Sequence, residues 1–250
     1  MLILLSPAKT LDMTPTDVAA TTPRLLDHTR TLVDILKRKS PADLSALMSI
    51  SDKLADLNFE RYQRFDEPEG GKPALLAFKG DVYQDLQADD FSSRELAFAD
   101  RQIRILSGLY GLLRPTDLMR PYRLEMGTKL PTRRGKNLYD FWSTRITELL
   151  NQDLRVEGSG LVLNLASQEY FKSLQPGRLD GRILNIHFKE LRNDTYRVIT
   201  FNAKRARGAM ARLITLEGIR EAGPLRELVV NDYVFAPDLS AEDDWTYVRR

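Results

Sequence analysis

The sequence predicts a mixed α/β fold in which helices cover one sheet. Three observations lead to this prediction. Several short apolar runs are unbroken rather than alternating, which is typical of strands buried on both faces. Longer segments place apolar residues every three or four positions, as on one face of a helix. No internal repeat or change of composition divides the 250 residues, so we expect one domain over 1–250.

Five apolar runs are the predicted strands. They occupy 1–5 (MLILL), 74–78 (ALLAF), 161–165 (LVLNL), 182–188 (RILNIHF) and 196–201 (YRVITF). Runs of this length with flanking polar residues favour strands over helices. The loosest stretches between the predicted elements are short, and they are 13–23, 66–73 and 231–244.

Helices are predicted where apolar spacing is three or four. Ser40-Pro41-Ala42-Asp43 has a capping serine with proline at the first helical position, which indicates a helix start. The apolar stripe that follows consists of Leu44, Leu47, Met48, Leu54 and Ala55. Similar stripes predict helices over 24–39, 139–155 and 203–214.

The composition excludes several classes of function. The chain has no cysteine, which excludes disulfides, thiolate catalysis and iron–sulfur ligation. His28 and His187 lack the spacing of zinc ligands, so we expect neither a metal site nor a cofactor, although carboxylate-bound Mg²⁺ stays open. No apolar run approaches the roughly 20 residues that span a bilayer, and the first residues lack the basic segment of a signal peptide. We therefore expect a cytoplasmic protein with no membrane partner.

Charge is distributed unevenly along the chain. Residues 101–136 carry nine Lys or Arg and only two acids, Asp117 and Glu125, whereas the whole chain has a net charge of +2. Residues 81–100 carry six acids and one base, Arg94. Either the basic stretch binds a negatively charged partner such as DNA, or the acidic stretch lies beside it and neutralises it.

Lysine occurs just after four of the predicted strands. The carboxyl ends of parallel strands share one edge of a sheet, and ligand sites of open α/β sheets gather at that edge. An anion, or the carboxylates of Asp81 and Glu169, would neutralise the lysines gathered there. We therefore expect one cavity to collect Ser6, Lys9, Lys79, Asn164, Lys172 and Lys204.

The predicted helix near Ala203 begins with Lys204, Arg205 and Arg207. Cations at a helix N-terminus oppose the helix dipole, but together with exposed backbone amides they form an anion-binding position. The alternative is a solvent-exposed face of the helix.

The segment 92–121 predicts a helix-hairpin-helix-like element. Gly108 and Gly111 flank an apolar Leu109-Tyr110 pair, and prolines follow at 115 and 121. Such elements hold DNA phosphates without reading bases. The two glycines are three residues apart, whereas the hairpin of such modules usually spaces its glycines two apart. Tyr110 and Tyr122 fit core packing better than base stacking.

Known catalytic motifs are absent or incomplete. Ser6 and Lys9 match the Ser-x-x-Lys pair of penicillin-binding enzymes, but their Ser-Asp-Asn and Lys-Thr-Gly elements are missing. Neither a Walker A loop nor a dinucleotide fingerprint is present. Asp81, Glu125 and Glu169 have two open interpretations, as acid–base or metal-binding groups and as salt-bridge partners. We assign no catalytic residue and expect a binding protein rather than an enzyme.

Six blocks resemble the YaaA peroxide-stress protein family. They are LLSPAKTL (4–11), ISDKLA (50–55), AFKGDVY (77–83), LSGLYGLLRPTDLMRPYRLEMG (106–127), NLASQEYFK (164–172) and AKRARG (203–208). The resemblance implies a cytoplasmic bacterial protein that limits intracellular iron and oxidative DNA damage under hydroperoxide stress. It also implies a single mixed α/β domain with a positively charged, DNA-binding cleft and a helix-hairpin-helix-like element.

The resemblance also implies which residues form that cleft. Those in the strand-end blocks are Ser6, Lys9, Lys79, Asp81, Tyr83, Asn164, Ser167, Glu169, Lys172, Lys204 and Arg207. The remaining blocks add Lys53, Arg114, Arg120 and Arg123. We expect the partner to be structured or damaged DNA, bound with little sequence preference. The alternative is an enzyme acting on a nucleotide or another phosphorylated small molecule in the same cleft.

Overall fold

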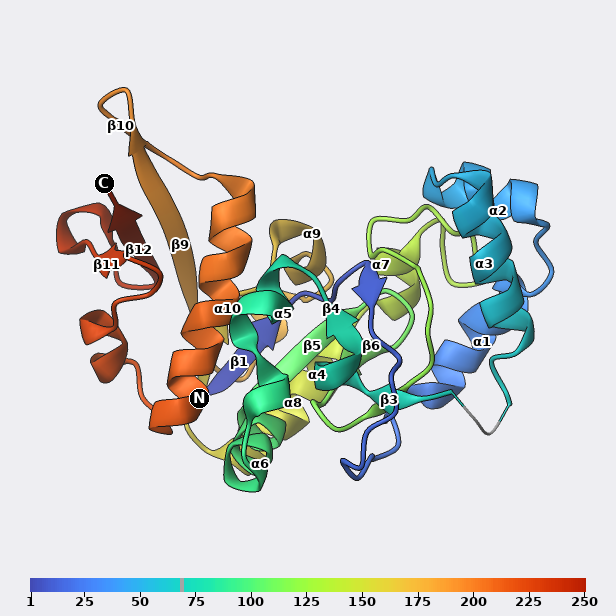
Figure 1. Cartoon of the computed structure of the whole chain (residues 1–250), viewed down its shortest axis with the longest axis horizontal. Helices are drawn as coiled ribbons and strands as arrows, with labels where there is room; N and C mark the ends of the chain where they lie inside the picture. The colour runs from blue at the N-terminus through green and yellow to red at the C-terminus, as the bar shows by residue number, and fades with distance from the viewer. Residues whose placement is uncertain (68–69) are drawn as a thin grey trace.

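The computed structural model describes residues 1–67 and 70–250, so the loose segment predicted over 66–73 lies partly outside the described residues. It confirms the mixed α/β class (Figure 1). The main sheet has the strand order β11-β12-β9-β8-β1-β5-β6, with β10 also paired to β9. Its strands are β1 (Leu2–Leu5), β5 (Ile103–Ser107), β6 (Gly111–Leu113), β8 (Leu161–Asn164), β9 (Arg182–Arg192), β10 (Thr195–Arg197), β11 (Val234–Phe235) and β12 (Asp244–Arg249).

The five central strands of this sheet are parallel, and the edges are antiparallel. β1 pairs in parallel with β5 and β8, and β9 pairs in parallel with β8 and β12. β6, β10 and β11 each pair antiparallel with a neighbour. Two small antiparallel pairs lie apart from the sheet, β2 (Thr10–Leu11) with β4 (Phe78–Lys79) and β3 (Lys72–Pro73) with β7 (Leu118–Met119).

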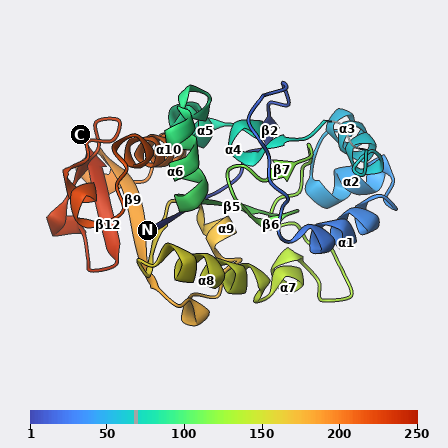
Figure 2. The ribbon, with the colours of Figure 1, turned by 90° about the horizontal axis from the view of Figure 1, so that it is seen from below.

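Helices cover both faces of the main sheet, as Figure 2 shows: α7 and α8 lie on one side, and α5, α6 and α10 on the other. The α-helices are α1 (Leu26–Leu36), α2 (Pro41–Met48), α3 (Asp52–Gln63), α4 (Ala74–Ala77), α5 (Asp81–Leu86), α6 (Ser93–Gln102), α7 (Leu138–Trp142), α8 (Arg145–Glu157), α9 (Gln168–Phe171) and α10 (Thr200–Glu217). Short 3₁₀ turns occupy Ala88–Asp90, Pro176–Arg178, Gly223–Glu227 and Pro237–Leu239. In the described part of the chain, no helix has the length and apolarity that crossing a bilayer requires.

Burial on both faces explains the unbroken apolar strands. Every residue of β1 is fully buried, because the strand lies between β5 and β8 and helices cover the sheet on both sides. Removing four such side chains from water contributes on the order of 1.5–3 kcal/mol each. The predictions over 1–5, 161–165 and 182–188 are confirmed.

The predicted helix start at Ser40 is confirmed, but the helix is shorter than predicted. The Ser40 hydroxyl accepts from the Asp43 amide, and the Asp43 carboxylate accepts from the Ser40 amide. Ser49 then takes a left-handed conformation that ends α2, and α3 begins at Asp52. In the same way, Ser143 has a positive φ and separates α7 from α8 within the segment predicted as one helix.

Two of the five strand predictions are wrong over most of their length. Residues 74–77 form the short helix α4, and only Phe78 extends into a strand, which pairs with β2 outside the main sheet. Full burial of this helix on all sides explains its unbroken apolar sequence, since periodicity cannot distinguish a buried helix from a buried strand. Residues 195–197 form β10, the return strand of a hairpin with β9, and α10 begins at Thr200.

The helix-hairpin-helix prediction over 92–121 is not confirmed. The first helix exists as α6, with a capping box at Ser92. The residues after it form the antiparallel hairpin β5–β6, which turns where Ser107 pairs with Gly111. Burial of Ile103 and Ile105 beside β1 favours a strand there. Tyr110 and Tyr122 are core residues, as predicted.

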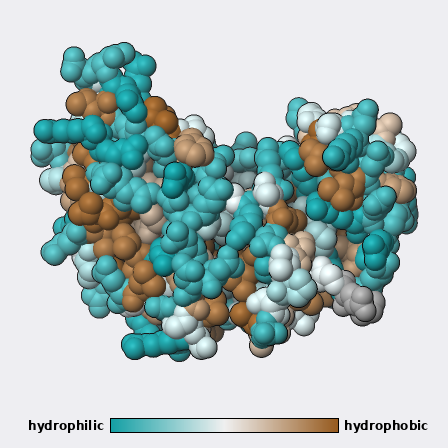
Figure 3. All heavy atoms as spheres, in the orientation of Figure 1, coloured by the Kyte–Doolittle hydropathy of each residue, from teal (hydrophilic) through white to brown (hydrophobic). Residues whose placement is uncertain are grey.

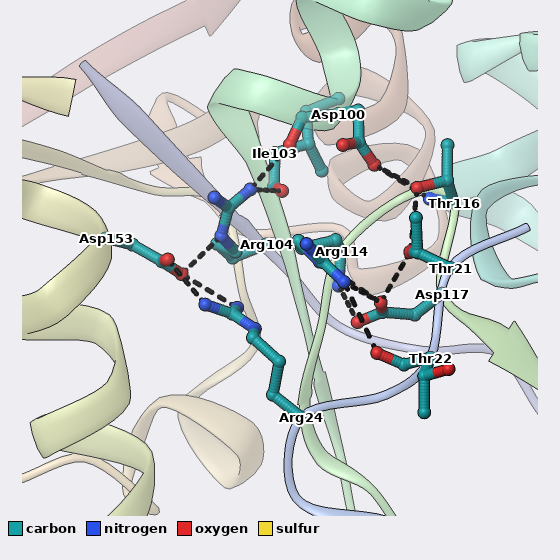
Figure 4. Close-up of polar contacts among 10 residues, drawn as sticks. All are labelled: Thr21, Thr22, Arg24, Asp100, Ile103, Arg104, Arg114, Thr116, Asp117 and Asp153. Carbon is teal, nitrogen blue, oxygen red and sulfur yellow. Dashed lines mark hydrogen bonds and ion pairs between the residues drawn. The ribbon is translucent and has the colours of Figure 1, made fainter. Parts of the chain in front are cut away.

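The basic stretch 101–136 is partly neutralised by nearby acids, as Figure 4 shows. Arg104 and Arg24 both bind the carboxylate of Asp153, with N–O distances of 2.5 and 2.6 Å. Arg114 binds Asp117 at 2.8 Å. These acids come mainly from α8 and from the stretch itself, and from 81–100 Asp100 helps to raise the pKa of Arg114. The neutralisation therefore draws only in part on the acidic stretch.

Candidate functional site

A pocket of about 370 Å³ opens at the carboxyl ends of β1 and β8. Five chain segments line it: residues 6–10, 79–83, 122–125, 165–170 and the α10 residues Lys204 and Arg207. In Figure 1 these ends lie near the middle of the molecule, beside α5, α9 and α10. The outline in Figure 3 dips above this region, between a raised end formed by β9, β10 and α10 and another formed by α2 and α3.

The parallel pairing of β1 and β8 brings residues 6–10 and 165–170 together. The amide of Ser167 donates to the Ser6 hydroxyl at 2.8 Å, and the Ser6 hydroxyl donates to the Ser167 hydroxyl at 3.2 Å. Tyr83 of α5 donates its hydroxyl proton to the backbone oxygen of Ser6 at 2.9 Å. Three segments far apart in sequence are thereby fixed to each other at one edge of the sheet.

The small β2–β4 pair brings in the lysine segments. Thr10 pairs with Lys79, so the turn after β1 and the turn before α5 lie side by side. A Cβ at Gly80 would lie 3.0 Å from the Cβ of Ala8, which shows how closely the two turns approach. This contact, rather than a shared parallel sheet, places Lys79 and Asp81 beside the end of β1.

Helix α10 is fixed at its start by a buried carboxylate. Glu190 of β9 accepts hydrogen bonds from Asn202, Tyr233 and Arg249 at 2.6, 2.6 and 2.8 Å. Burial raises the pKa of Glu190, but the hydrogen bonds to its carboxylate outweigh this and hold the pKa below its usual range. The network sets the position from which α10 presents Lys204 and Arg207. Because the helix begins at Thr200, both cations lie beyond its first turn, so the predicted conflict with the helix dipole is minor.

Most of the residues predicted for the cleft line this pocket. They are Ser6, Lys9, Lys79, Asp81, Tyr83, Arg123, Ser167, Glu169, Lys204 and Arg207. The narrower expectation that six strand-end residues face one cavity holds for Ser6, Lys9, Lys79 and Lys204. What these residues bind stays a prediction.

Asn164 and Lys172 point elsewhere. The Asn164 amide donates to Asn185 of β9 at 2.9 Å, and its side-chain oxygen accepts from the Ala166 amide at 3.1 Å. Asn164 therefore holds the turn that carries Ser167. The Lys172 ammonium lies 5.3 Å from the ring centroid of Tyr139, in a cation–π contact outside the pocket.

The other three predicted residues are scattered. Lys53 is exposed on α3, and Arg114 is engaged with Asp117. Arg120 lines a separate cavity of about 330 Å³ together with Phe65 and Tyr110. The central basic block therefore contributes Arg123 alone of its three predicted arginines.

Most of the pocket's cations are already paired. Glu125 lies 3.1 Å from both Lys9 and Arg123. Lys79 lies 2.7 Å from Asp89, which raises the pKa of Lys79, and Lys204 lies 3.8 Å from Asp81. The structure does not confirm the basic cleft that the family resemblance implies, because five cations and three carboxylates share this pocket.

Arg207 differs from those four cations. Arg207 lines the pocket, and its Nε atom is buried without a hydrogen-bond partner. Among the described residues it forms no ion pair. Burial lowers the pKa of Arg207, and no nearby carboxylate opposes that effect.

Three pocket residues with ionisable side chains lie outside the site that the sequence predicts. The sequence leaves Glu125 open as an acid–base group or a salt-bridge partner and does not assign Tyr122 or Tyr170 to the cleft, yet all three line the pocket. Burial raises the pKa of Tyr122 and of Tyr170, so both hydroxyls stay neutral. All three lie inside the six sequence blocks that resemble the family, and this position is the sequence feature that could have placed them in the cleft.

The pocket shows no arrangement suited to a metal ion. Within residues 1–67 and 70–250, no group of three or more His, Asp or Glu side chains gathers closely enough to hold one. Asp81 and Glu169 both line the pocket, but Asp81 faces Lys204 and Glu169 accepts the Gly127 amide at 2.9 Å. Both carboxylates are better placed to balance charge and fix backbone than to coordinate a cation.

Comparison with known proteins shows which family the chain belongs to. The family model described as peroxide stress protein YaaA matches residues 1–239, beyond residue 208, where the last of the six sequence blocks ends. A UPF0246 protein from Acaryochloris marina (strain MBIC 11017) is 48% identical over 253 residues, covering 100% of each chain. The pocket-lining turns all fall within the matched region. The chain therefore belongs to the peroxide stress protein YaaA family.

Proposed function

We propose that this protein acts in the peroxide stress response by binding DNA at the strand-end pocket, and that it limits iron-dependent oxidative damage in this way. The observation that carries the proposal is the convergence of Lys9, Lys79, Arg123, Lys204 and Arg207, from four separate segments, on one pocket. Lysine and arginine side chains gathered at one place are the usual means of holding phosphates.

The paired state of the lysines favours contact with phosphates at the pocket rim. Lys9, Lys79 and Lys204 are all substantially exposed, with side-chain exposures of 63, 40 and 47%. Exposed ion pairs are worth at most about 1 kcal/mol, so a phosphate can replace a carboxylate partner at small cost. The acids then discourage unspecific association with any anion.

A second candidate function is an enzyme acting on a nucleotide or another phosphorylated small molecule. The volume of about 370 Å³ favours this candidate, because small-ligand sites occupy roughly 300–1,000 Å³. In that case Asp81 or Glu169 acts as the acid or base, and the lysines hold the anion.

Salt dependence of DNA binding tests the first candidate. We expect the affinity to fall steeply between low and moderate salt, because each bound phosphate releases counterions. Replacing Lys9, Lys79 and Lys204 together by Gln should reduce the slope of log K against log salt by about 1 for each phosphate that the variant no longer holds. Fluorescence anisotropy with a labelled mismatched duplex measures both quantities.

A matched control replaces Lys53, Lys129 and Lys136 by Gln, three exposed lysines outside the pocket. This triple variant removes the same charge and should leave the slope nearly unchanged. An affinity insensitive to salt, or a larger loss in the control than in the pocket variant, would contradict DNA binding at this pocket. Turnover of a nucleotide by the wild-type protein would support the second candidate.

A further inference from the structure

Arg207 poses an energetic problem that the rest of the pocket does not. Arg207 is partly buried, and its Nε atom is shielded from water without a hydrogen-bond partner, which is unfavourable for a polar group. Three other arginines also have one buried nitrogen without a hydrogen bond. Arg24 and Arg123 are paired through their other nitrogens, and Arg120 lies near enough to Glu67 to lower the pKa of that carboxyl. Arg207 has no such compensation among the described residues.

The floor of the pocket belongs to the protein core. Val82, Tyr122, Leu124 and Leu165 line it, with exposed fractions of 8, 5, 2 and 1%. These core side chains close one wall of the pocket, and its volume of about 370 Å³ is that of a small-ligand site. A site of this size suits the end of a strand or a free nucleotide better than the interior of a long strand.

We propose that Arg207 is the receptor for a terminal phosphate, the phosphomonoester of a DNA end or of a free nucleotide. This inference rests on the proposed phosphate-binding function of the same pocket. A phosphomonoester suits Arg207 because it carries nearly two negative charges and three free oxygens, and guanidinium binds such oxygens through two parallel hydrogen bonds. An internucleotide phosphate carries one charge and continues into a further nucleotide on both sides. The paired lysines at the rim then hold the rest of the strand.

Paired DNA strands that differ only in the end group test the proposal. The probes are fluorescein-labelled single strands of one sequence, ending in a 3′-phosphate or in a 3′-hydroxyl, with deoxyadenosine monophosphate and deoxyadenosine as competitors. We expect the wild-type protein to bind the 3′-phosphate strand at least about tenfold more tightly, the usual worth of a charge-assisted hydrogen bond. The nucleotide should compete and the nucleoside should not.

Variants assign the preference to Arg207. In Arg207→Met we expect the preference for the 3′-phosphate strand to disappear. In Arg207→Lys we expect a smaller preference than in the wild-type protein, because lysine keeps the charge but cannot form the two parallel hydrogen bonds. Arg205→Met is the matched control: it removes a cation two residues away on α10, where Arg205 pairs with Asp85 outside the pocket. The control should keep the full preference.

Thermal unfolding separates binding from a structural role. Arg207→Met should not lower the Tm without ligand, since it removes a partly buried cation that has no ion-pair partner while keeping most of the side-chain volume. A fall in Tm, or an end-phosphate preference that survives Arg207→Met, overturns the proposal.

If both strands bind equally, with the steep salt dependence described above, DNA binding stands and the role of Arg207 fails. If only the free nucleotide binds, and does so through Arg207, the role of Arg207 stands and the DNA function fails.

Discussion

At the scale of single residues, Glu125 sets how much positive charge the pocket offers. Its carboxylate lies 3.1 Å from both Lys9 and Arg123, so one acid neutralises part of two cations. An incoming phosphate must compete with this carboxylate. Glu125 therefore weakens anion binding while it keeps the two cations in place.

Replacing Glu125 with Gln should tighten the binding of phosphate-bearing probes. We expect a several-fold gain in affinity at low salt, because one unit charge at such distances is worth on the order of 1 kcal/mol in partly exposed sites. Titration with deoxyadenosine monophosphate measures the change. Glu60→Gln, at an exposed acid on α3, controls for net charge. Weaker binding in Glu125→Gln would instead indicate that Glu125 itself contacts the ligand.

Residue types and their positions after apolar segments predict many of the pocket residues, but they do not predict which acid pairs with which lysine. Lys9, Lys79 and Lys204 were predicted because they follow apolar segments, and each lines the pocket. The partners Asp89 and Glu125 lie 10 and 116 residues away from the lysines that they bind, so no local pattern indicates them. Arg207 stands out only when burial and the absence of a partner are known.

At the scale of elements, the packing of α5 against α10 determines the pocket. α5 carries Asp81 and Tyr83, and α10 carries Lys204 and Arg207. The two helices approach closely at Gly208, where an added Cβ would overlap the backbone oxygen of Val82. Only a residue without a side chain fits at this contact.

Replacing Gly208 with Ala should force the two helices apart. We expect a loss of about 3 kcal/mol or more of unfolding free energy, because backbone atoms cannot yield as a flexible side chain can. Urea unfolding measures this loss, and anion binding should weaken in the same variant. Gly223→Ala is the matched control: a Cβ there meets nothing within 4 Å, so we expect a change within about 0.5 kcal/mol. Equal stability of the two variants would contradict this packing.

Sequence patterns predict where secondary-structure elements lie better than they predict whether an element is a helix or a strand. The run 74–78 lies at the predicted place beside the pocket, but it is a buried helix, because an apolar run of this length suits either element when every side is covered. Gly108 and Gly111 correctly indicated a tight turn, yet the turn joins β5 to β6. Pairing with β1 decides this, and such long-range pairing has no local sequence signal.

At the scale of the whole molecule, the predicted cavity at a parallel sheet edge exists, but parallel strands supply only some of its residues. β1 and β8 meet there as parallel neighbours, and the bond between Ser6 and Ser167 joins their ends. The segments bearing Lys79 and Lys204 come from outside the parallel strands, through the β2–β4 pair and through α10. The site is thus assembled by the tertiary fold around a core of two parallel strands.

One measurement tests most directly whether this pocket is the functional phosphate site. A crystal structure of the wild-type protein with deoxyadenosine monophosphate should place the phosphate within hydrogen-bond distance, about 2.7–3.0 Å, of the Arg207 guanidinium. The nucleoside should then lie toward the rim lysines, Lys9, Lys79 and Lys204. A phosphate bound outside the pocket, for example at the exposed lysines of 129–136, with the pocket empty in the same crystal, would contradict the assignment.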